Sequence, residues 1–213
     1  MPYRLTREML NRLDMNHLEE WVLANGIGGF SAGSVLNASF RKQHGYLIIS
    51  KKPPIRRFLV LARTEEKILF GEETVSLACQ KTASRFLRGD RFLESFTLDE
   101  AVTYRYAVKG IILEKTIAPL YGKNAVGIHY VIQTGSQAAK LAVTPLFNHR
   151  PHSDIANGET LKFAEKQRSL EWDLVPEADP STTIRFLASA GAFVPETDKI
   201  TEEFEKEVLP EMK

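Results

Sequence analysis

Hydrophobic and polar residues alternate with a period of two over much of the chain. In residues 102–108 four apolar or aromatic side chains alternate with three others, and residues 111–118 repeat the pattern after Lys109-Gly110. Side chains two apart lie on one face of a strand, so each run predicts a strand with one buried face. Two such runs joined by a two-residue turn that contains glycine predict a β-hairpin.

Further runs of the same kind lie on both sides of this hairpin. Residues 125–133 and 141–147 follow turn-forming segments at 121–124 and 134–136, and together with the hairpin they predict a four-stranded antiparallel meander. The remaining short runs are 46–50, 58–62, 67–70, 74–78, 169–174 and 182–188. About ten short strands with frequent turns predict two packed sheets. The expected fold is mainly β, a large two-sheet antiparallel β-sandwich over residues 1–195.

Helical periodicity is confined to the two ends of the chain. Met9, Leu10 and Leu13 follow Thr6 on one helical face, which predicts a short N-terminal helix. Apolar side chains recur every four residues from 200 to 208, and Pro210 ends that run. Residues 196–213 therefore predict an acidic terminal helix, which either caps the sandwich or is a linker.

Composition and charge narrow the classes of partner. The 28 basic and 27 acidic residues give a net charge of +1, which provides no general attraction to nucleic acid or to an anionic membrane. Cys79 is the single cysteine, so no intramolecular disulfide forms and a reducing compartment is expected. The first residues lack the apolar segment of a secretory signal, and no window approaches about 20 apolar residues. We expect a cytoplasmic protein without nucleic-acid or membrane partners.

Two segments resemble ligand sites but have simpler interpretations. The glycine-rich residues 25–33 carry Ser31 where a dinucleotide fingerprint needs glycine, and they lack the Gly-Lys-Ser/Thr end of a P-loop. We interpret them as a tight backbone feature. Residues 41–57 hold six basic and no acidic side chains. The two basic clusters flank the apolar run 46–50, and aromatic interleaving of the kind that stacks bases is missing, so these charges are interpreted as solvated strand ends.

No complete catalytic or metal-binding constellation is visible in the sequence. His149 and His152 lie three residues apart, but Cys79 and His44 are isolated, so we expect no metal and no cofactor. No Gly-x-Ser-x-Gly elbow is present, and a pair of glycosidic carboxylates cannot be assigned from spacing. Aromatic side chains that could stack on sugar rings or pack in the core are Trp21, Phe30, Tyr46, Tyr104, Tyr106, Tyr121, Tyr130 and Trp172. Alternation favours the core for most of them.

Several segments together resemble one known family. Residues 20–34, Glu-Trp-Val-Leu-Ala-Asn-Gly-Ile-Gly-Gly-Phe-Ser-Ala-Gly-Ser, are similar to the opening signature of the N-terminal domain of bacterial and archaeal glycogen debranching enzymes. Residues 41–47 resemble the Arg-x-Tyr-His-Gly-Leu-Leu stretch that follows it, with Gln43 and Tyr46 as departures. Residues 53–54, 113–115, 121–124 and 145–150 occur in the family's order. The resemblance covers residues 18–152.

The resemblance implies a β-supersandwich of the galactose-mutarotase-like kind. In this family such a domain precedes an α-helical toroid that carries the glycosidic carboxylates, so no catalytic residue is expected in this chain. The implied function is that of a non-catalytic N-terminal domain that supports hydrolysis of α-1,6 branch points in glycogen-like glucans by a helical partner domain, with α-glucan as a further ligand. The alternative is a stand-alone carbohydrate-binding or protein-interaction module. A mutarotase-like enzyme would need a His base and a Glu acid in one cleft, from His44, His129, His149 and Glu114.

The motif segments also supply the candidate substrate-contacting or domain-interface residues. These are Trp21, Asn25, Gly28, Gly29, Arg41, His44, Asn148, Arg150 and His152. Loops at one end of a sandwich can meet although their strands are distant in sequence. We therefore predict that residues 25–34, 41–45 and 148–152 converge on one rim, either as the wall of a substrate pocket or as a brace that holds the loops together.

Overall fold

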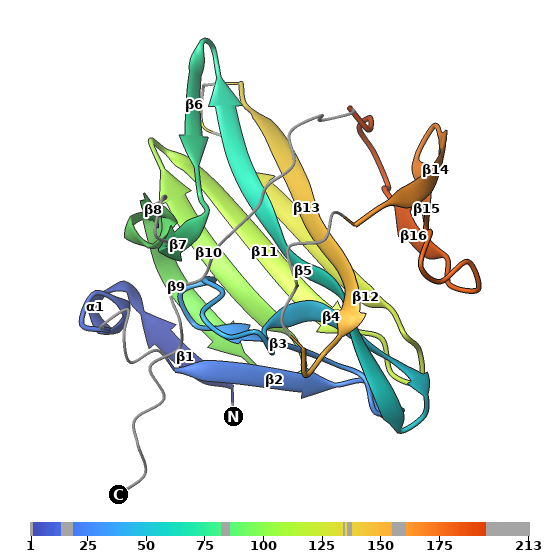
Figure 1. Ribbon diagram of the computed structural model, residues 1–213. Coiled ribbons are helices and arrows are strands. Elements are labelled where there is room, and N and C mark those ends of the chain that lie inside the picture. Colours follow the sequence, from blue (N-terminus) through green and yellow to red (C-terminus); the bar gives the residue numbers. More distant parts are fainter. Residues whose placement is uncertain are drawn as a thin grey trace, which may run out of the picture. The chain divides into compact units, whose positions relative to one another are not determined.

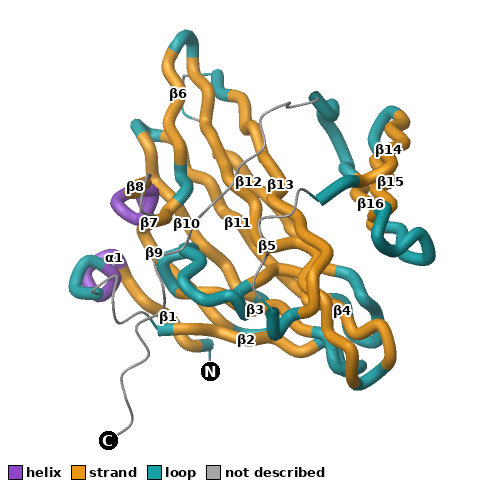
Figure 2. Tube along the Cα trace, viewed as in Figure 1, coloured by secondary structure: helices purple, strands orange, loops and turns teal. Residues whose placement is uncertain are grey.

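The computed structural model describes residues 2–13, 19–81, 86–133, 135, 138–154 and 161–194. Strands make up nearly all of its regular structure (Figure 2). The chain divides into two compact units, one containing the described residues up to Asp154 and the other containing residues 161–194. Among the described residues, no helix has the length and apolar character needed to cross a membrane.

The first large sheet is built around the predicted hairpin (Figure 1). Its strands, in spatial order, are β1 (Tyr3–Thr6), β9 (Leu93–Leu98), β10 (Val102–Val108), β11 (Ile111–Pro119) and β12 (Val126–Gln133), all antiparallel. Lys109 and Gly110 both have positive φ angles, 48° and 81°, as the favoured two-residue hairpin turn requires. The hairpin and the strand after it are confirmed.

The second large sheet contains a correction to the predicted meander. Its order is β13-β5-β4-β3-β2, with β6 also paired to β5. The strands are β2 (Glu20–Ala24), β3 (Phe30–Ser34), β4 (Gly45–Lys52), β5 (Ile55–Phe70), β6 (Glu73–Ser76) and β13 (Lys140–Pro151). The run at 141–147 was predicted to continue the meander, but it pairs with β5 in this sheet instead. Alternation identifies a strand and its faces, whereas the partner depends on tertiary packing.

Strand β5 differs from prediction in length. The runs at 58–62 and 67–70 are parts of one strand of 16 residues, which continues through the polar segment between them. The side chains of Arg63, Thr64, Glu65 and Glu66 are buried, so their polarity does not interrupt the strand. Polar residues normally mark turns, and burial with partners is what overrides that rule here.

Smaller elements complete the described structure. The predicted N-terminal helix is present as α1 (Arg7–Leu10), a 3₁₀ helix spans Gly89–Phe92, and β7 (Cys79–Lys81) pairs with β8 (Phe86–Arg88). The second unit holds a three-stranded antiparallel sheet of β14 (Phe163–Arg168), β15 (Glu171–Pro176) and β16 (Ile184–Leu187). The sequence placed these residues in one domain with the rest. The helix predicted over 196–213 lies outside the described residues.

The core of the first unit lies between its two large sheets, which confirms the β-sandwich. The inward positions of β10, namely Val102, Tyr104, Tyr106 and Val108, are almost completely buried. From the facing sheet, the Trp21 indole donates a hydrogen bond of 2.7 Å to the Tyr104 hydroxyl. Outward positions of the same hairpin carry polar cross-strand pairs, as expected for a sheet with one solvated face.

Candidate functional site

The family-like signature at residues 20–34 forms the β2–β3 hairpin, and its turn is tied to a distant turn. Asn25 is 1% exposed, and its side-chain amide donates to the carbonyl of Lys123 at 2.9 Å. Its side-chain oxygen accepts from the backbone of Ile27 at 3.0 Å, and its carbonyl accepts from Gly122 at 2.7 Å. One buried asparagine therefore joins the β2–β3 turn to the β11–β12 turn.

A third turn, between β4 and β5, is fixed to the same place. The Asn124 side chain exchanges two hydrogen bonds with the backbone of Ser50, at 3.0 and 2.9 Å, as a neighbouring strand would. Gly28 has a φ of 94°, and a Cβ there would lie 2.4 Å from the carbonyl oxygen of Pro54. We call residues 25–29, 53–54 and 120–124 the three-turn tip. The glycine-rich segment is thus a close-packed backbone feature, as the sequence predicted.

Beside this tip lies an open, basic hollow on the surface. It has a volume of about 490 Å³ and is lined by Ile55, Arg56, Arg57, Phe58, Pro151, His152 and Ser153. The Arg57 guanidinium donates to the carbonyl of Gly28 at 2.7 Å, which links the hollow to the three-turn tip. The hollow combines apolar surface with cationic groups, a mixture that suits either a polar ligand or a partner surface.

His152 is held in place within the hollow by its ring and its backbone. Its ring packs edge-on against the Phe30 ring, with 5.2 Å between the ring centroids. Its backbone N–H donates to the carbonyl of Arg57 at 3.0 Å. Burial lowers the pKa of His152, and the positive charges of Arg150, Arg57 and Lys42 lower it further. Its buried Nε2 has no hydrogen-bond partner among the described residues. The neutral imidazole is therefore the favoured form in this basic environment.

The end of β13 is joined to the segment at residues 41–45. Arg150 donates to the carbonyl of Lys42 at 2.6 Å and to that of Asp154 at 2.5 Å. Asn148 accepts a hydrogen bond from the backbone of His149 at 2.8 Å, so its side chain shapes the strand locally. Residues 41–45 and 148–152 thus meet through the Arg150 guanidinium.

Arg41 and His44 meet at the start of β2. Both lie against the carboxylate of Glu20, with 3.7 Å between the His44 Nε2 and a Glu20 oxygen. His44 is 5% exposed, and burial is the main cause of its lowered pKa; Arg41 lowers it further, while Glu20 raises it. Trp21 points into the core rather than toward solvent.

The three motif segments do not form a single constellation. Asn25 follows the last residue of β2, whereas His44 lies beside Glu20 at the first, and five extended residues separate the two by about 16 Å. Residues 148–152 contact both of the other segments: Arg150 binds the carbonyl of Lys42, and the His152 ring packs on Phe30. The structure thus places a brace formed by Asn25 and Asn124 at the tip, and a basic cluster that includes Arg57 and Arg150 beside it.

A buried polar network in the sandwich core did not emerge from the sequence. Lys115 and Glu66 form an ion pair of 2.9 Å with both side chains 0% exposed. The Tyr130 and Thr64 hydroxyls also contact the Glu66 carboxylate, and Lys115 donates to the Tyr46 hydroxyl at 2.9 Å. A usable signal exists, since Lys115 occupies the buried phase of β11, two residues from the apolar positions on either side.

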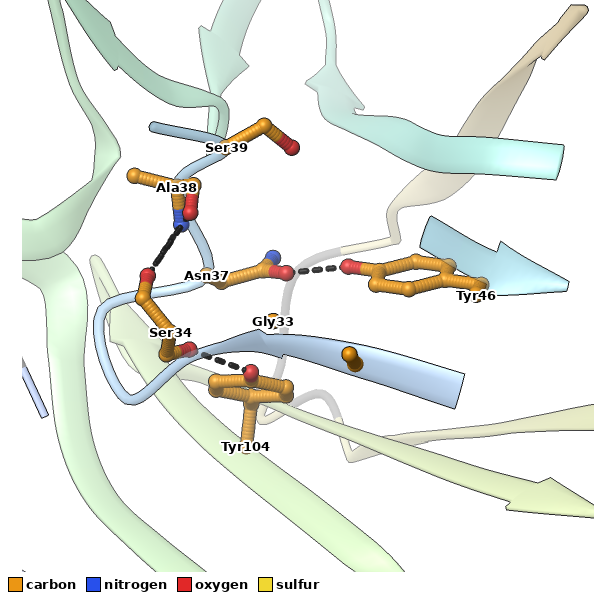
Figure 3. A pocket seen from close by; sticks show the side chains of 8 residues that line it. Gly33, Ser34, Asn37, Ala38, Ser39, Tyr46 and Tyr104 are labelled. Atoms are coloured by element: carbon orange, nitrogen blue, oxygen red, sulfur yellow. Dashed lines mark hydrogen bonds between the residues drawn. The ribbon is translucent and has the colours of Figure 1, made fainter. Parts of the chain in front are cut away.

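The network continues beneath the β3–β4 connection. The Tyr46 hydroxyl donates to Asn37, and the Tyr104 hydroxyl donates to the carbonyl of Ser34 at 2.7 Å (Figure 3). Ser34 also binds the backbone of Ala38 through its own hydroxyl, donating at 2.7 Å and accepting at 3.0 Å. These groups line a cavity of about 10 Å³, which has room for no more than one water molecule. It is too small for a sugar, so the network holds the core together.

The other chemistries considered from the sequence find no support here. Within the residues described, no group of three or more His, Cys, Asp or Glu side chains is placed to hold a metal ion. Glu114 pairs with Arg105 on the outer face of its hairpin, whereas His44 lies against Glu20. His149 lies 2.7 Å from the Lys51 ammonium. In the described part of the chain, no contact joins Glu114 to His44, His129 or His149, the residues considered for a mutarotase-like pair.

Comparison with known proteins identifies a family. Residues 19–208 match the family model described as glycogen debranching enzyme N-terminal, a span that includes β2 to β16 and so strands of both units. No curated protein and no solved structure matches significantly.

Proposed function

The chain belongs to the family of glycogen debranching enzyme N-terminal domains, and from this membership we propose that it is the non-catalytic β-sandwich domain of a debranching-type glycosidase. A separate helical domain supplies the two carboxylates that hydrolyse α-1,6 branch points in glycogen-like glucans. The observation that carries the proposal is the family match over residues 19–208, which includes the three-turn tip and the basic hollow. The protein acts in the cytoplasm, on carbohydrate reserves.

The site contributes a rigid surface toward the helical domain. Asn25 and Asn124 fix the turns with side-chain hydrogen bonds, so the surface needs little ordering on association. The guanidinium groups of Arg56 and Arg57 at the hollow complement a carboxylate-bearing partner face and favour its approach. The sandwich therefore supports hydrolysis by docking and shaping, while the helical domain performs the chemistry.

The test measures glucose release from a branched dextrin with single-glucose α-1,6 stubs. We expect no release by the pure chain, and release by a debranching-type helical domain that increases when this chain is present. The variant Arg56→Glu reverses one exposed charge at the hollow, and Arg4→Glu makes the same change on β1. Stimulation is expected to fall with Arg56→Glu and to stay unchanged with the Arg4→Glu control.

Three outcomes would contradict the proposal. Glucose release by the chain alone, abolished by changing one of its own glutamates, would place an active site in the sandwich. A helical domain equally active with and without this chain would remove the supporting role. Glucan binding combined with no effect on the helical domain would favour the alternative of a stand-alone carbohydrate-binding module.

A further inference from the structure

One aromatic ring in the first unit stands apart from the others. Trp21, Tyr46, Tyr104 and Tyr106 are buried in the sandwich core, whereas Tyr121 is 86% exposed. Tyr121 lies in the β11–β12 turn, which belongs to the three-turn tip. Single exposed apolar side chains are common on protein surfaces, so exposure alone does not indicate a site.

Tyr121 is distinguished by the hydrogen bonds that fix the backbone of its turn. The turn that carries Tyr121 is closed by hydrogen bonds from Leu120 to Ala125 at 2.9 Å and from Lys123 to Leu120 at 3.1 Å. Gly122 and Lys123, the two residues after Tyr121, are bound to the buried Asn25. The backbone on both sides of the ring is therefore fixed, and the ring is presented to solvent from a rigid base.

The facing turn is shaped to accept the ring. Gly26 has a φ of 80°, and a Cβ at that position would lie 2.5 Å from the Tyr121 ring. Any other residue would therefore displace the ring as well as strain the backbone. The ring lies against bare backbone on one side, which restricts its rotation and leaves the remainder open to a ligand.

The surroundings of the ring indicate the chemical class of that ligand. The three residues after the ring, Gly122, Lys123 and Asn124, are exposed and not apolar, while Leu120 before it is 39% exposed, so the exposed apolar surface of this turn is one aromatic ring and part of one leucine. A stable protein interface buries roughly 800 Å² per partner around a larger apolar centre, which the β11–β12 turn alone does not offer. A hexose has one face of C–H groups that packs on an aromatic ring and a rim of hydroxyls that suits polar neighbours.

We propose that Tyr121 is a stacking platform for a glucose unit of an α-glucan chain, with Lys123 placed to meet the sugar hydroxyls. This deepens the proposed function, because the sandwich then holds the polysaccharide as well as the helical domain. The platform is pre-organised by the Asn25 brace, so binding requires little ordering of the protein. The platform lies on the three-turn tip, and the hydrogen bond from Arg57 to Gly28 connects this tip to the neighbouring hollow.

The test is affinity electrophoresis of the full chain in gels that contain glycogen, with maltoheptaose titration as the quantitative measurement. Tyr121→Ala is expected to weaken glucan binding roughly tenfold or more, as for loss of a central contact residue. Tyr121→Phe keeps the ring face and is expected to bind as the parent does. Leu187→Ala, at a position 73% exposed in the second unit, is the matched control and is expected to change nothing. Thermal unfolding of each variant confirms that all are folded.

Unchanged glucan affinity in Tyr121→Ala, or no glucan binding by the parent chain, overturns the platform. Loss of affinity for the helical domain in Tyr121→Ala with glucan binding intact also overturns it, and makes the ring a domain contact. The hydrolysis assay separates this inference from the proposed function. If the parent chain stimulates the helical domain but Tyr121→Ala binds glucan normally, the platform alone is wrong.

Discussion

The buried ion pair between Lys115 and Glu66 allows the sharpest test of how the core is held together. Both side chains are 0% exposed, and 2.9 Å separates their charged atoms. Burial lowers the pKa of Lys115, and the neighbouring carboxylate of Glu66 opposes that shift. The substitution Lys115→Met keeps the length of the side chain and removes its charge, so Glu66 stays buried without its cation.

The expected loss of stability in Lys115→Met follows from two opposing contributions to the ion pair. At an effective dielectric constant of about 20, unit charges 2.9 Å apart attract by about 6 kcal/mol. Desolvation of the two ions costs several kcal/mol each, so the net worth of the pair is small. Removal of one partner is different, because the other charge keeps its desolvation cost. We expect Lys115→Met to lower the free energy of unfolding by about 3–5 kcal/mol.

The assay is urea unfolding followed by tryptophan fluorescence, with a double variant. In Lys115→Met/Glu66→Leu both charges are gone, and the Thr64 and Tyr130 hydroxyls, 3.0 Å apart, remain partners for each other. The double variant is therefore expected to recover at least about 2 kcal/mol relative to Lys115→Met. Arg105→Met breaks the half-exposed pair with Glu114 on the same hairpin and should cost under about 1 kcal/mol.

Two results would refute this reasoning. If Lys115→Met costs no more than Arg105→Met, Glu66 is not held in a low-dielectric core. If the double variant is no more stable than Lys115→Met, the destabilisation comes from lost packing rather than from an unpaired charge.

Three further predictions concern the tip, the motif histidine and the thiol. Asn25→Ala should lower the free energy of unfolding by about 2–3 kcal/mol, because the Ile27 N–H and the Lys123 C=O lose their buried partner. Thermal unfolding measures this loss, and a loss below about 0.5 kcal/mol contradicts the role of Asn25 as a brace. Since the pKa of His44 is lowered in the folded state, the unfolded chain takes up the proton first, and stability should fall as pH drops below about 6.5. Urea unfolding midpoints measured from pH 8 to pH 5 should fall less in His44→Gln than in the parent. An equal fall in both proteins would contradict this role of His44. Burial raises the pKa of the Cys79 thiol to about 12, so a thiol reagent at pH 8 should react with it only after unfolding, and rapid labelling of the native protein would disprove this.

The sequence predicted those parts of the fold that local pattern controls. Alternation and the Lys109-Gly110 turn were sufficient for β10 and β11, because a hairpin needs only its own residues to specify register. The run at 141–147 was identified as a strand but assigned to the wrong sheet, since its partner β5 lies far away in sequence. Polar residues 63–66 were read as a break because their buried partners, such as Lys115, come from the other sheet.

The candidate site shows the same limit. The contact between residues 41–45 and 148–152 was expected from loop position, and Arg150 makes it. The placement of Asn25 and His44 at opposite ends of β2 depends on the register of β2, β3 and β4, in which Ala32 pairs with both Val22 and Gly45, and no local pattern encodes that register. The exposure of Tyr121 follows from its position in a turn rather than a strand, and that much was available from the sequence.

The pairing of β13 with β5 has a consequence for the order of folding. The hairpins β4–β5 and β10–β11 join neighbouring residues and can form early, whereas Thr64 and Pro145 meet only after about 80 residues of chain close into a loop. The contacts of Arg150 at the end of β13 are therefore expected to form after these hairpins. Contacts that form after the transition state mainly govern the rate of unfolding. The end of β13 would then determine how long each folded molecule survives.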